Sequence, residues 1–137
     1  MKTIKKVLLI DDDIVSNYLN KELLEKLDFT NEIVIKNNGR DAIVYLQSDC
    51  YAENDYPCLI LLDLKMPVLD GFDFLVEYDK LDIDKKDNTI IVVLTTSANA
   101  DDIMRLRTLG KFDRINKALD LDKLVDIYHK YFRSHGI

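Results

Sequence analysis

Four groups of polar side chains that could do chemistry each come directly after a short, mostly apolar run in this chain. They are Asp11, Asp12 and Asp13 after residues 7–10, Asp63 after residues 59–62, Thr95 and Thr96 after residues 90–94, and Lys117 after residues 112–116. A single acid, hydroxyl or lysine in such a position is usually structural. Four groups that converge at one edge of a sheet would instead form a site.

The chemistry of such a site follows from its charges. Two carboxylates about 4 Å apart repel each other by about 4 kcal/mol at an effective dielectric constant of roughly 20, so converging aspartates require a cation. Hard oxygen ligands with room for water suit Mg²⁺. Lys117 offers a second positive charge, and Thr95 offers a hydroxyl donor. Together with a carboxylate nucleophile, for which Asp63 is the candidate, these groups can transfer a phosphoryl group to an aspartate.

The elements that must position these residues alternate between strands and helices. Apolar runs at residues 7–10, 59–62 and 90–94 are typical of strands buried on both faces, whereas residues 33–35 and 112–116 are shorter or mixed and indicate edge strands. We therefore expect an α/β protein with five helices and a doubly wound five-stranded parallel sheet in the flavodoxin-like order 2-1-3-4-5. In that order the ends of strands one, three, four and five meet at one edge.

Local signals set the expected limits of the helices. Asn38 and Asn99 predict helix N-caps, Gly110 predicts a helix end, and Asp70-Gly71 after Pro67 predicts a turn into the third helix. The four-residue spacing of Val15, Leu19, Leu23 and Leu27 places these side chains on one apolar face of the first helix. Residues 48–57 and 81–89 are mostly polar and predict loops.

Composition limits the possible functions. A length of 137 residues predicts one domain, residues 1–137, and a net charge of -6 argues against nucleic-acid binding. No apolar run is long enough for a membrane span, and the apolar segment near the start ends at Asp11, which indicates a strand rather than a signal peptide. Cys50 and Cys58 lack zinc-ligand spacing and are interpreted as reduced thiols of a cytoplasmic protein. His129 and His135 lie far from the acidic motifs in sequence, which argues against a histidine-based catalytic site.

These motifs together resemble the receiver domain of two-component response regulators. The resemblance rests on Val7-Leu-Leu-Ile-Asp-Asp12, Leu61-Leu-Asp-Leu-Lys-Met-Pro67 with Asp70-Gly71, Val93-Leu-Thr95 and Lys117, and it covers nearly the whole chain. It implies that Asp63 is the phospho-acceptor. It also implies that Asp12 and Asp63 bind Mg²⁺ directly with the backbone carbonyl of Lys65, while Asp11 acts largely through water. Thr95 would be the switch hydroxyl and Lys117 the lysine that contacts the phosphate, whereas Asp13 is interpreted as a helix N-terminal residue favoured by the helix dipole.

The resemblance also implies a stand-alone response regulator. Such a protein would accept a phosphoryl group from a histidine kinase or a histidine phosphotransfer protein. It would catalyse its own Mg²⁺-dependent phosphorylation and dephosphorylation rather than act as a conventional enzyme. Because no further domain follows the last predicted helix, we expect output through protein contacts or onward phosphoryl transfer, by a monomer or weak dimer. The expected contact face comprises the helix after Thr95, the strand at residues 112–116 and the last helix.

Two positions depart from the family pattern. Receivers usually have Lys-Pro after the fifth strand, often with a cis bond, but Ala118 follows Lys117 here. A cis bond before a residue other than proline costs roughly 2.5–4 kcal/mol, so the sequence predicts a trans bond. The position of the family's aromatic switch falls on Arg114. A switch that buries an aromatic ring cannot work there in the usual way.

Two alternatives remain open from the sequence. Asp11-Asp12-Asp13-Ile14-Val15 also fits the motif of haloacid-dehalogenase-like phosphatases, with Asp11 as nucleophile. That class would leave the motif around Asp63 unexplained. The other alternative is a receiver-shaped interaction module that is not phosphorylated.

Overall fold

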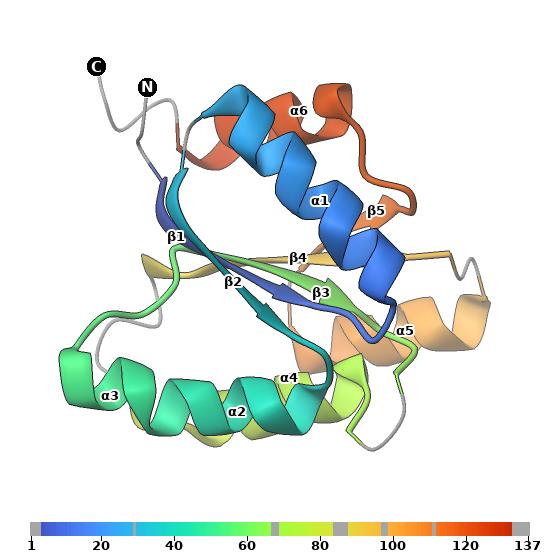
Figure 1. Ribbon diagram of the computed structural model, residues 1–137. Coiled ribbons are helices and arrows are strands. Elements are labelled where there is room, and N and C mark those ends of the chain that lie inside the picture. The colour runs from blue at the N-terminus through green and yellow to red at the C-terminus, as the bar shows by residue number, and fades with distance from the viewer. Residues whose placement is uncertain are drawn as a thin grey trace.

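Five parallel strands form one sheet in the predicted order. The computed structural model describes residues 4–28, 30–66, 69–83, 88–96, 99–110 and 112–132. The strands are β1 (Ile4–Ile10), β2 (Thr30–Lys36), β3 (Leu59–Asp63), β4 (Ile90–Thr95) and β5 (Asp113–Asn116). They lie in the order β2-β1-β3-β4-β5, and every neighbouring pair is parallel (Figure 1). The flavodoxin-like α/β fold is therefore confirmed. Pro67 and His135 lie outside the described residues, as do residues 84–87 of the predicted loop at 81–89.

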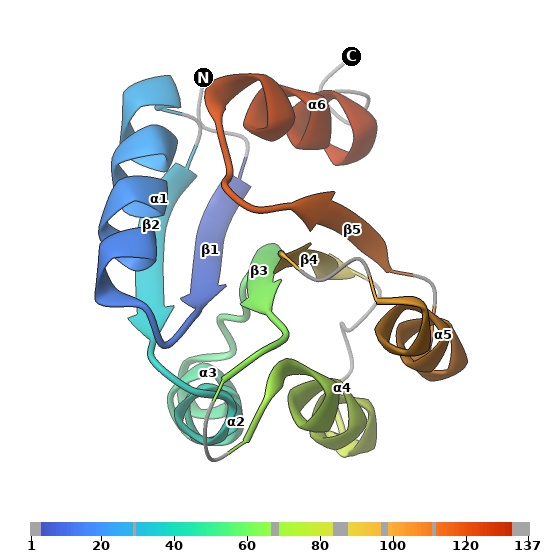
Figure 2. The same cartoon turned by 90° about the vertical axis from the view of Figure 1, so that its right-hand side faces the viewer.

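Helices cover both faces of this sheet. The helices α1 (Ile14–Leu27) and α6 (Leu121–Tyr131) lie on one face, and α2 (Gly39–Gln47), α4 (Gly71–Lys80) and α5 (Ala100–Leu109) lie on the other (Figures 1 and 2). These are the five predicted helices. None of the helices in the described parts of the chain combines the length and the apolar character that crossing a bilayer requires.

The central strands are buried on both faces, as their continuous apolar runs predict. Leu8 and Ile10 of β1 pack in the core on the side of α2 and α4, whereas Val7 and Leu9 pack in the core on the side of α1 and α6. Full burial of one such side chain stabilises the fold by about 1.5–3 kcal/mol. Because β1, β3 and β4 are held in this way from both sides, the positions at which they end are rigid.

The predicted helix limits are confirmed at their caps. The side chain of Asn38 accepts a hydrogen bond from the backbone N–H of Asp41 at the start of α2, and Asn99 accepts one from Asp101 at the start of α5. Gly110 ends α5 with φ of 152°, a conformation that side chains with a Cβ rarely adopt.

The predicted apolar face of the first helix is wrong for half of its length. Leu23 and Leu27 pack against the core, but Val15 and Leu19 are 63% and 52% exposed. Each four-residue step overshoots a full helical turn by about 40°, so a row of residues spaced by four winds around the helix and cannot all face one neighbour. The buried line of α1 is instead made by Asn17, Asn20 and Leu24.

Part of the predicted loop at residues 48–57 is helical. A short additional helix, α3 (Asp49–Glu53), follows α2 and ends at Asn54, whose φ is 51°. Cys50 is the buried residue of α3. A helix this short, with one buried side chain, has no apolar period that could be recognised in the sequence.

A buried lysine ties the start of β1 to the end of this connection. Lys6 as a whole residue is only 3% exposed. Its Nζ donates hydrogen bonds to Tyr45 Oη at 2.8 Å and to the backbone carbonyl of Asp55 at 2.9 Å, and it lies 3.1 Å from Asp55 Oδ2. Burial alone would lower the pKa of Lys6, but the contacts with Tyr45 and Asp55 outweigh it and raise the pKa. Lys6 is therefore charged and fully partnered inside the fold.

We predict that Lys6→Ala lowers the free energy of unfolding by about 2–3 kcal/mol, because it removes a buried ion pair and leaves Tyr45 without its donor. Urea denaturation measures the difference. Lys5→Ala is the matched control, since Lys5 is the exposed neighbour in the same strand, and we expect it to change the free energy by less than about 0.5 kcal/mol. Equal losses in the two variants would show that the contacts of Lys6 are not stabilising.

Candidate functional site

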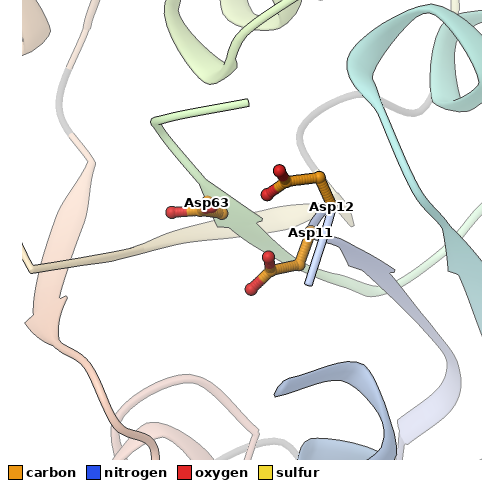
Figure 3. Close-up of side chains that lie close together, drawn as sticks. All are labelled: Asp11, Asp12 and Asp63. Carbon is orange, nitrogen blue, oxygen red and sulfur yellow. The ribbon is translucent and has the colours of Figure 1, made fainter. Parts of the chain in front are cut away.

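Three aspartates converge at the carboxyl ends of β1 and β3. Asp11 and Asp12 follow β1, Asp63 ends β3, and one carboxylate oxygen from each lies within 4.8 Å of those of the other two (Figure 3). The strand register causes this arrangement, because Ile10 pairs with Leu62 and the residues that follow them emerge side by side. Asp11 and Asp63 are only 4% and 7% exposed, whereas Asp12 is exposed. The predicted convergence of the acids is confirmed.

Lys117 reaches this acidic cluster from the far side of β4. Its Nζ lies 2.7 Å from Asp11 Oδ2 and 3.6 Å from Asp63 Oδ2. Its backbone N–H donates to the carbonyl of Thr95 at 3.1 Å, which ties the end of β5 to the end of β4. Thr95 itself is buried at that end of β4. The four groups that the sequence places at strand ends are therefore at one edge of the sheet.

The peptide bond between Lys117 and Ala118 is cis, so the predicted trans bond is wrong. That prediction used the intrinsic preference of an isolated bond and took no account of tertiary contacts. In the fold, the carbonyls on either side of Lys117, those of Asn116 and Ala118, both accept hydrogen bonds from Lys123 Nζ, at 2.9 and 2.8 Å.

The turn between β1 and α1 fixes Asp11 and separates Asp13 from the cluster. The backbone N–H of Asp13 donates to Asp11 Oδ1 at 2.9 Å. The side chain of Asp13 caps α1 instead, accepting from the N–H of Val15 at 3.0 Å and from Ser16 Oγ at 2.9 Å. The interpretation of Asp13 as a helix N-terminal residue is confirmed.

Asn17 also holds this turn, although the sequence did not single it out. Its side chain is buried, and Nδ2 donates to the carbonyl of Asp11 at 2.8 Å. The signal that could have found it is a polar residue on the line of α1 that faces the sheet, where an apolar side chain would ordinarily pack.

The loop after Asp63 is held by a close backbone approach. The N–H of Gly71 donates to the carbonyl of Leu64 at 3.0 Å. A Cβ at Gly71 would lie 2.5 Å from the carbonyl oxygen of Asp63, so only glycine fits this position. Asp70 caps α4 by accepting from the N–H of Asp73 at 2.9 Å. The predicted Asp70-Gly71 turn is thus confirmed.

Lys65 connects this loop to α5. The N–H of Lys65 hydrogen-bonds to the carboxylate of Asp63, while its exposed side chain reaches away and lies 3.1 Å from Asp102 Oδ2 near the start of α5. This ion pair could not be predicted, because no short-range sequence pattern joins residues that are 37 positions apart. The predicted role of the Lys65 carbonyl stays a prediction.

Burial and repulsion together change the titration of Asp63. Burial, reinforced by the negative charge of Asp11 and opposed by Lys117, raises the pKa of Asp63 to about 6. Burial alone would lower the pKa of Lys117, but its contacts with Asp11 and Asp63 raise it. One ammonium group therefore offsets only part of the repulsion between the carboxylates. Such a set of convergent carboxylate oxygens fits a hard divalent cation.

Comparison with known proteins places this chain in a family. A sequence profile of the response regulator receiver domain matches residues 7–129. The chain therefore belongs to the response regulator receiver domain family, which consists of signalling domains that accept phosphorylation.

Individual relatives agree with this assignment. The response regulator Rcp1 of Synechocystis is 39% identical over 101 residues, which span 73% of this chain and 67% of Rcp1. The crystal structure of its Mn²⁺-bound form has a TM-score of 0.71 and 31% identity, covering 92% of this chain and 90% of that chain. A two-component response regulator from Cytophaga hutchinsonii has a TM-score of 0.82 and 26% identity, covering 95% and 98%. The phosphorylated cyanobacterial phytochrome response regulator RcpA has a TM-score of 0.78 and 32% identity, covering 95% of each chain.

The raised pKa of Asp63 predicts a pH dependence of stability in metal-free buffer. The folded chain retains a proton on Asp63 up to a pH of about 6, whereas an ordinary aspartate loses it near 3.8. The proton is bound more tightly in the folded state, so this stabilising contribution is complete below a pH of about 4 and is lost as the pH rises through about 6.

We therefore expect metal-free Asp63→Asn to be more stable than the parent at about pH 7.5, by about 2–3 kcal/mol, and the difference to shrink toward pH 4. Urea denaturation in a chelating buffer measures both curves. Asp126→Asn, which removes the same charge from an exposed position on α6, is the control and should leave the pH dependence unchanged. The same pH slope in the parent and in Asp63→Asn would contradict a raised pKa of Asp63.

Proposed function

We propose that this protein is a response regulator whose Asp63 accepts a phosphoryl group from a histidine kinase or a histidine phosphotransfer protein. The observation that carries the proposal is the placement of Lys117 Nζ within 2.7 and 3.6 Å of Asp11 and Asp63, at the edge where β1, β3 and β5 end. A nucleophilic carboxylate beside a fixed ammonium group and two further acids is suited to attack on phosphorus.

In the transfer, a carboxylate oxygen of Asp63 attacks phosphorus while the bond between phosphorus and the donor's histidine nitrogen breaks. The ammonium group of Lys117 pairs with the phosphoryl oxygens, and the Thr95 hydroxyl donates a hydrogen bond to one of them. Asp11, Asp12, Asp63 and the Lys65 carbonyl would hold Mg²⁺, with Asp11 acting largely through water. When bound, the metal would neutralise charge on the phosphoryl oxygens. Hydrolysis of the acyl phosphate at the same site returns Asp63 to a carboxylate, so the chain promotes both halves of its own cycle.

An exposed apolar surface on α1 lies beside the entrance to this site. It consists of Ile14, Val15, Tyr18 and Leu19, which are all more than half exposed. These residues follow directly after Asp12 and Asp13, so a partner that carries a histidine to Asp63 would be close enough to contact them. A helix of the phosphoryl donor, with an apolar face around its histidine, is the occupant that this geometry favours.

The phosphorylation signal is proposed to travel to the face formed by α5, β5 and α6. Thr95 is drawn toward the new oxygens, and the added negative charge competes with Asp102 for the ammonium group of Lys65. Both changes act on the start of α5. We also expect the segment of residues 96–98 to be drawn inward with Thr95; Ser97 and Ala98 of this segment lie outside the described residues. On this face Arg114 is exposed, and its guanidinium donates to Asn116 Oδ1 at 3.3 Å. We therefore expect Arg114 to exchange polar partners on phosphorylation, in place of the burial of an aromatic ring that is usual in the family.

The two alternative functions have less support. Asp11 Oδ2 lies closer to Lys117 Nζ, at 2.7 Å, than Asp63 Oδ2 does, at 3.6 Å, so Asp11 is the more tightly ion-paired carboxylate and the weaker candidate for a nucleophile. An unphosphorylated interaction module would not need the repulsive cluster around Asp63. We further propose a cytoplasmic location, which the free thiols of Cys50 and Cys58 support. We also propose that the protein is a monomer or a weak dimer.

Incubation with acetyl phosphate and Mg²⁺ tests the proposed function. We expect one phosphoryl group per chain, on Asp63, detected by intact-mass and peptide mass spectrometry. Asp63→Asn should take none, and Lys117→Ala should react about 100-fold more slowly because it lacks a charge-stabilising donor. Asp126→Asn is the control and should react normally. Label that persists in Asp63→Asn but disappears in Asp11→Asn would instead indicate the phosphatase.

The proposed route to α5 predicts a change in hydrogen exchange. Addition of beryllofluoride, a phosphate mimic, should increase amide exchange over Ala100–Leu109 in the parent, and Thr95→Ala should accept phosphate but show no such increase.

Lys65→Gln should show raised exchange in α5 before beryllofluoride is added, by roughly twofold, since an exposed ion pair contributes at most about 1 kcal/mol.

Lys80→Gln is the matched control for the exchange experiment, because it removes the exposed ion pair between Lys80 and Glu77 within α4. Exchange in α5 that is the same in Lys65→Gln and Lys80→Gln would show that the ion pair from Lys65 to Asp102 carries no signal.

A further inference from the structure

Asn17 is a buried polar side chain that packing alone does not explain. It lies on the line of α1 that faces the sheet and is only 3% exposed. Its Nδ2 group donates to the carbonyl of Asp11, but among the described residues no group donates to its Oδ1 atom. A buried acceptor without a donor destabilises a fold, and an apolar side chain would avoid that cost. A reason other than stability is therefore needed for asparagine at this position.

The main contact of Asn17 fixes the peptide group that leads from Asp11 to Asp12. That group is planar, so a hydrogen bond that holds the Asp11 carbonyl also sets the orientation of the Asp12 N–H and Cα. The distance from Asn17 Nδ2 to the carbonyl oxygen is 2.8 Å, and the bond is buried. On the other side of Asp11, its N–H donates to the carbonyl of Lys36 at 3.2 Å. The chain is thus held on both sides of Asp11 as it leaves β1.

Asp12 depends on this backbone support more than its neighbours do. Asp11 is paired with Lys117, and Asp13 caps α1. None of the described residues donates a hydrogen bond to the Asp12 carboxylate or forms an ion pair with it, and Asp12 is exposed. The direction in which this carboxylate leaves the chain is therefore set by the backbone of the turn (Figure 3).

A second contact of Asn17 reaches the loop between β2 and α2. Its Nδ2 also lies 3.4 Å from Asn37 Oδ1. In the same loop, the N–H of Gly39 donates to the carbonyl of Leu69 at 3.1 Å, and a Cβ at Gly39 would lie 2.6 Å from that oxygen. Leu69 belongs to the loop that follows Asp63. Asn17 thus contacts both the turn that carries two of the acids and a loop that is tied to the third.

We propose that Asn17 is a positioning residue for the Mg²⁺ site, acting through the peptide group between Asp11 and Asp12 to hold the Asp12 carboxylate close to Asp63. This rests on the proposed function in one respect, that the three aspartates hold Mg²⁺. A carboxylate that is already oriented loses less conformational freedom when a metal binds. Residues that support metal ligands in this way typically contribute about 10–100-fold to metal affinity.

Titration of Mg²⁺ into the full chain of Asn17→Leu tests the proposal. Leucine has a similar volume, lacks the donor and removes the unpartnered Oδ1. We expect the dissociation constant for Mg²⁺, followed by amide NMR shifts, to rise about tenfold or more. Urea denaturation in a chelating buffer should show little change in the free energy of unfolding, because the lost partner of the Asp11 carbonyl is offset by removal of the buried Oδ1. A merely structural role would instead change stability and leave the Mg²⁺ affinity unaltered.

Asn20→Leu is the matched control. Asn20 is the other buried asparagine on the same line of α1, and none of the hydrogen bonds described above for the turn involves it. This variant should bind Mg²⁺ as the parent does. Asn17→Ala removes the amide without adding a large apolar side chain and should show the same loss of affinity, so the test does not depend on how leucine packs. Unchanged affinity in both Asn17 variants, or equal losses in Asn17→Leu and Asn20→Leu, would overturn the proposal.

The outcome is separable from the proposed function. A parent that binds no Mg²⁺ would overturn the proposed metal site, and the role of Asn17 with it. A parent that binds Mg²⁺ no more tightly than Asn17→Leu does would overturn only the role of Asn17. Neither measurement depends on whether Asp63 takes label from acetyl phosphate.

Discussion

The repulsion between Asp11 and Asp63, offset by the ammonium group of Lys117, is the constraint on which the rest of the structure depends. Two nearly buried carboxylates at neighbouring strand ends destabilise the metal-free fold, and the raised pKa of Asp63 reflects this. The same arrangement favours the binding of any group that adds positive charge beside Asp11 and Asp63. Converging carboxylates of this kind fit a hard divalent cation, which would offset their repulsion.

The surrounding fold keeps these groups in place despite their repulsion. The parallel register between β1 and β3 sets the carboxylates side by side, and the hydrogen bond from Lys117 to Thr95 fixes the lysine across β4. Asn17 and Gly71 hold the two loops that carry the acids. The rigid core of the central strands, packed from both faces, supports all of these contacts. The site thus lies at the carboxyl ends of strands that the packed core of the sheet holds in fixed positions.

The surface with a proposed role in recognition of the phosphoryl donor is a place where local packing rules are broken. The first half of α1 exposes Val15 and Leu19 and buries Asn17, the reverse of an ordinary amphipathic helix. At such positions the residue type does not suit the burial that the fold gives it. Mismatches of this kind are expected where contacts with other molecules have to form. This surface and the proposed output face lie on different elements, so binding a phosphoryl donor and binding a target need not compete.

The sequence by itself determined the strands, their order, and the strand ends at which Asp11, Asp12, Asp63, Thr95 and Lys117 meet. Continuous apolar runs identify buried parallel strands, and connection rules leave few orders for them. Tertiary structure alone decided which side of α1 faces the sheet, the helical start of the connection after Ser48, the cis bond after Lys117, and the partners of Lys6 and Lys65. The partners of Lys6 and Lys65 lie far away in the chain, and the buried side of α1 depends on what packs against it, whereas periodicity and spacing report only on the elements themselves.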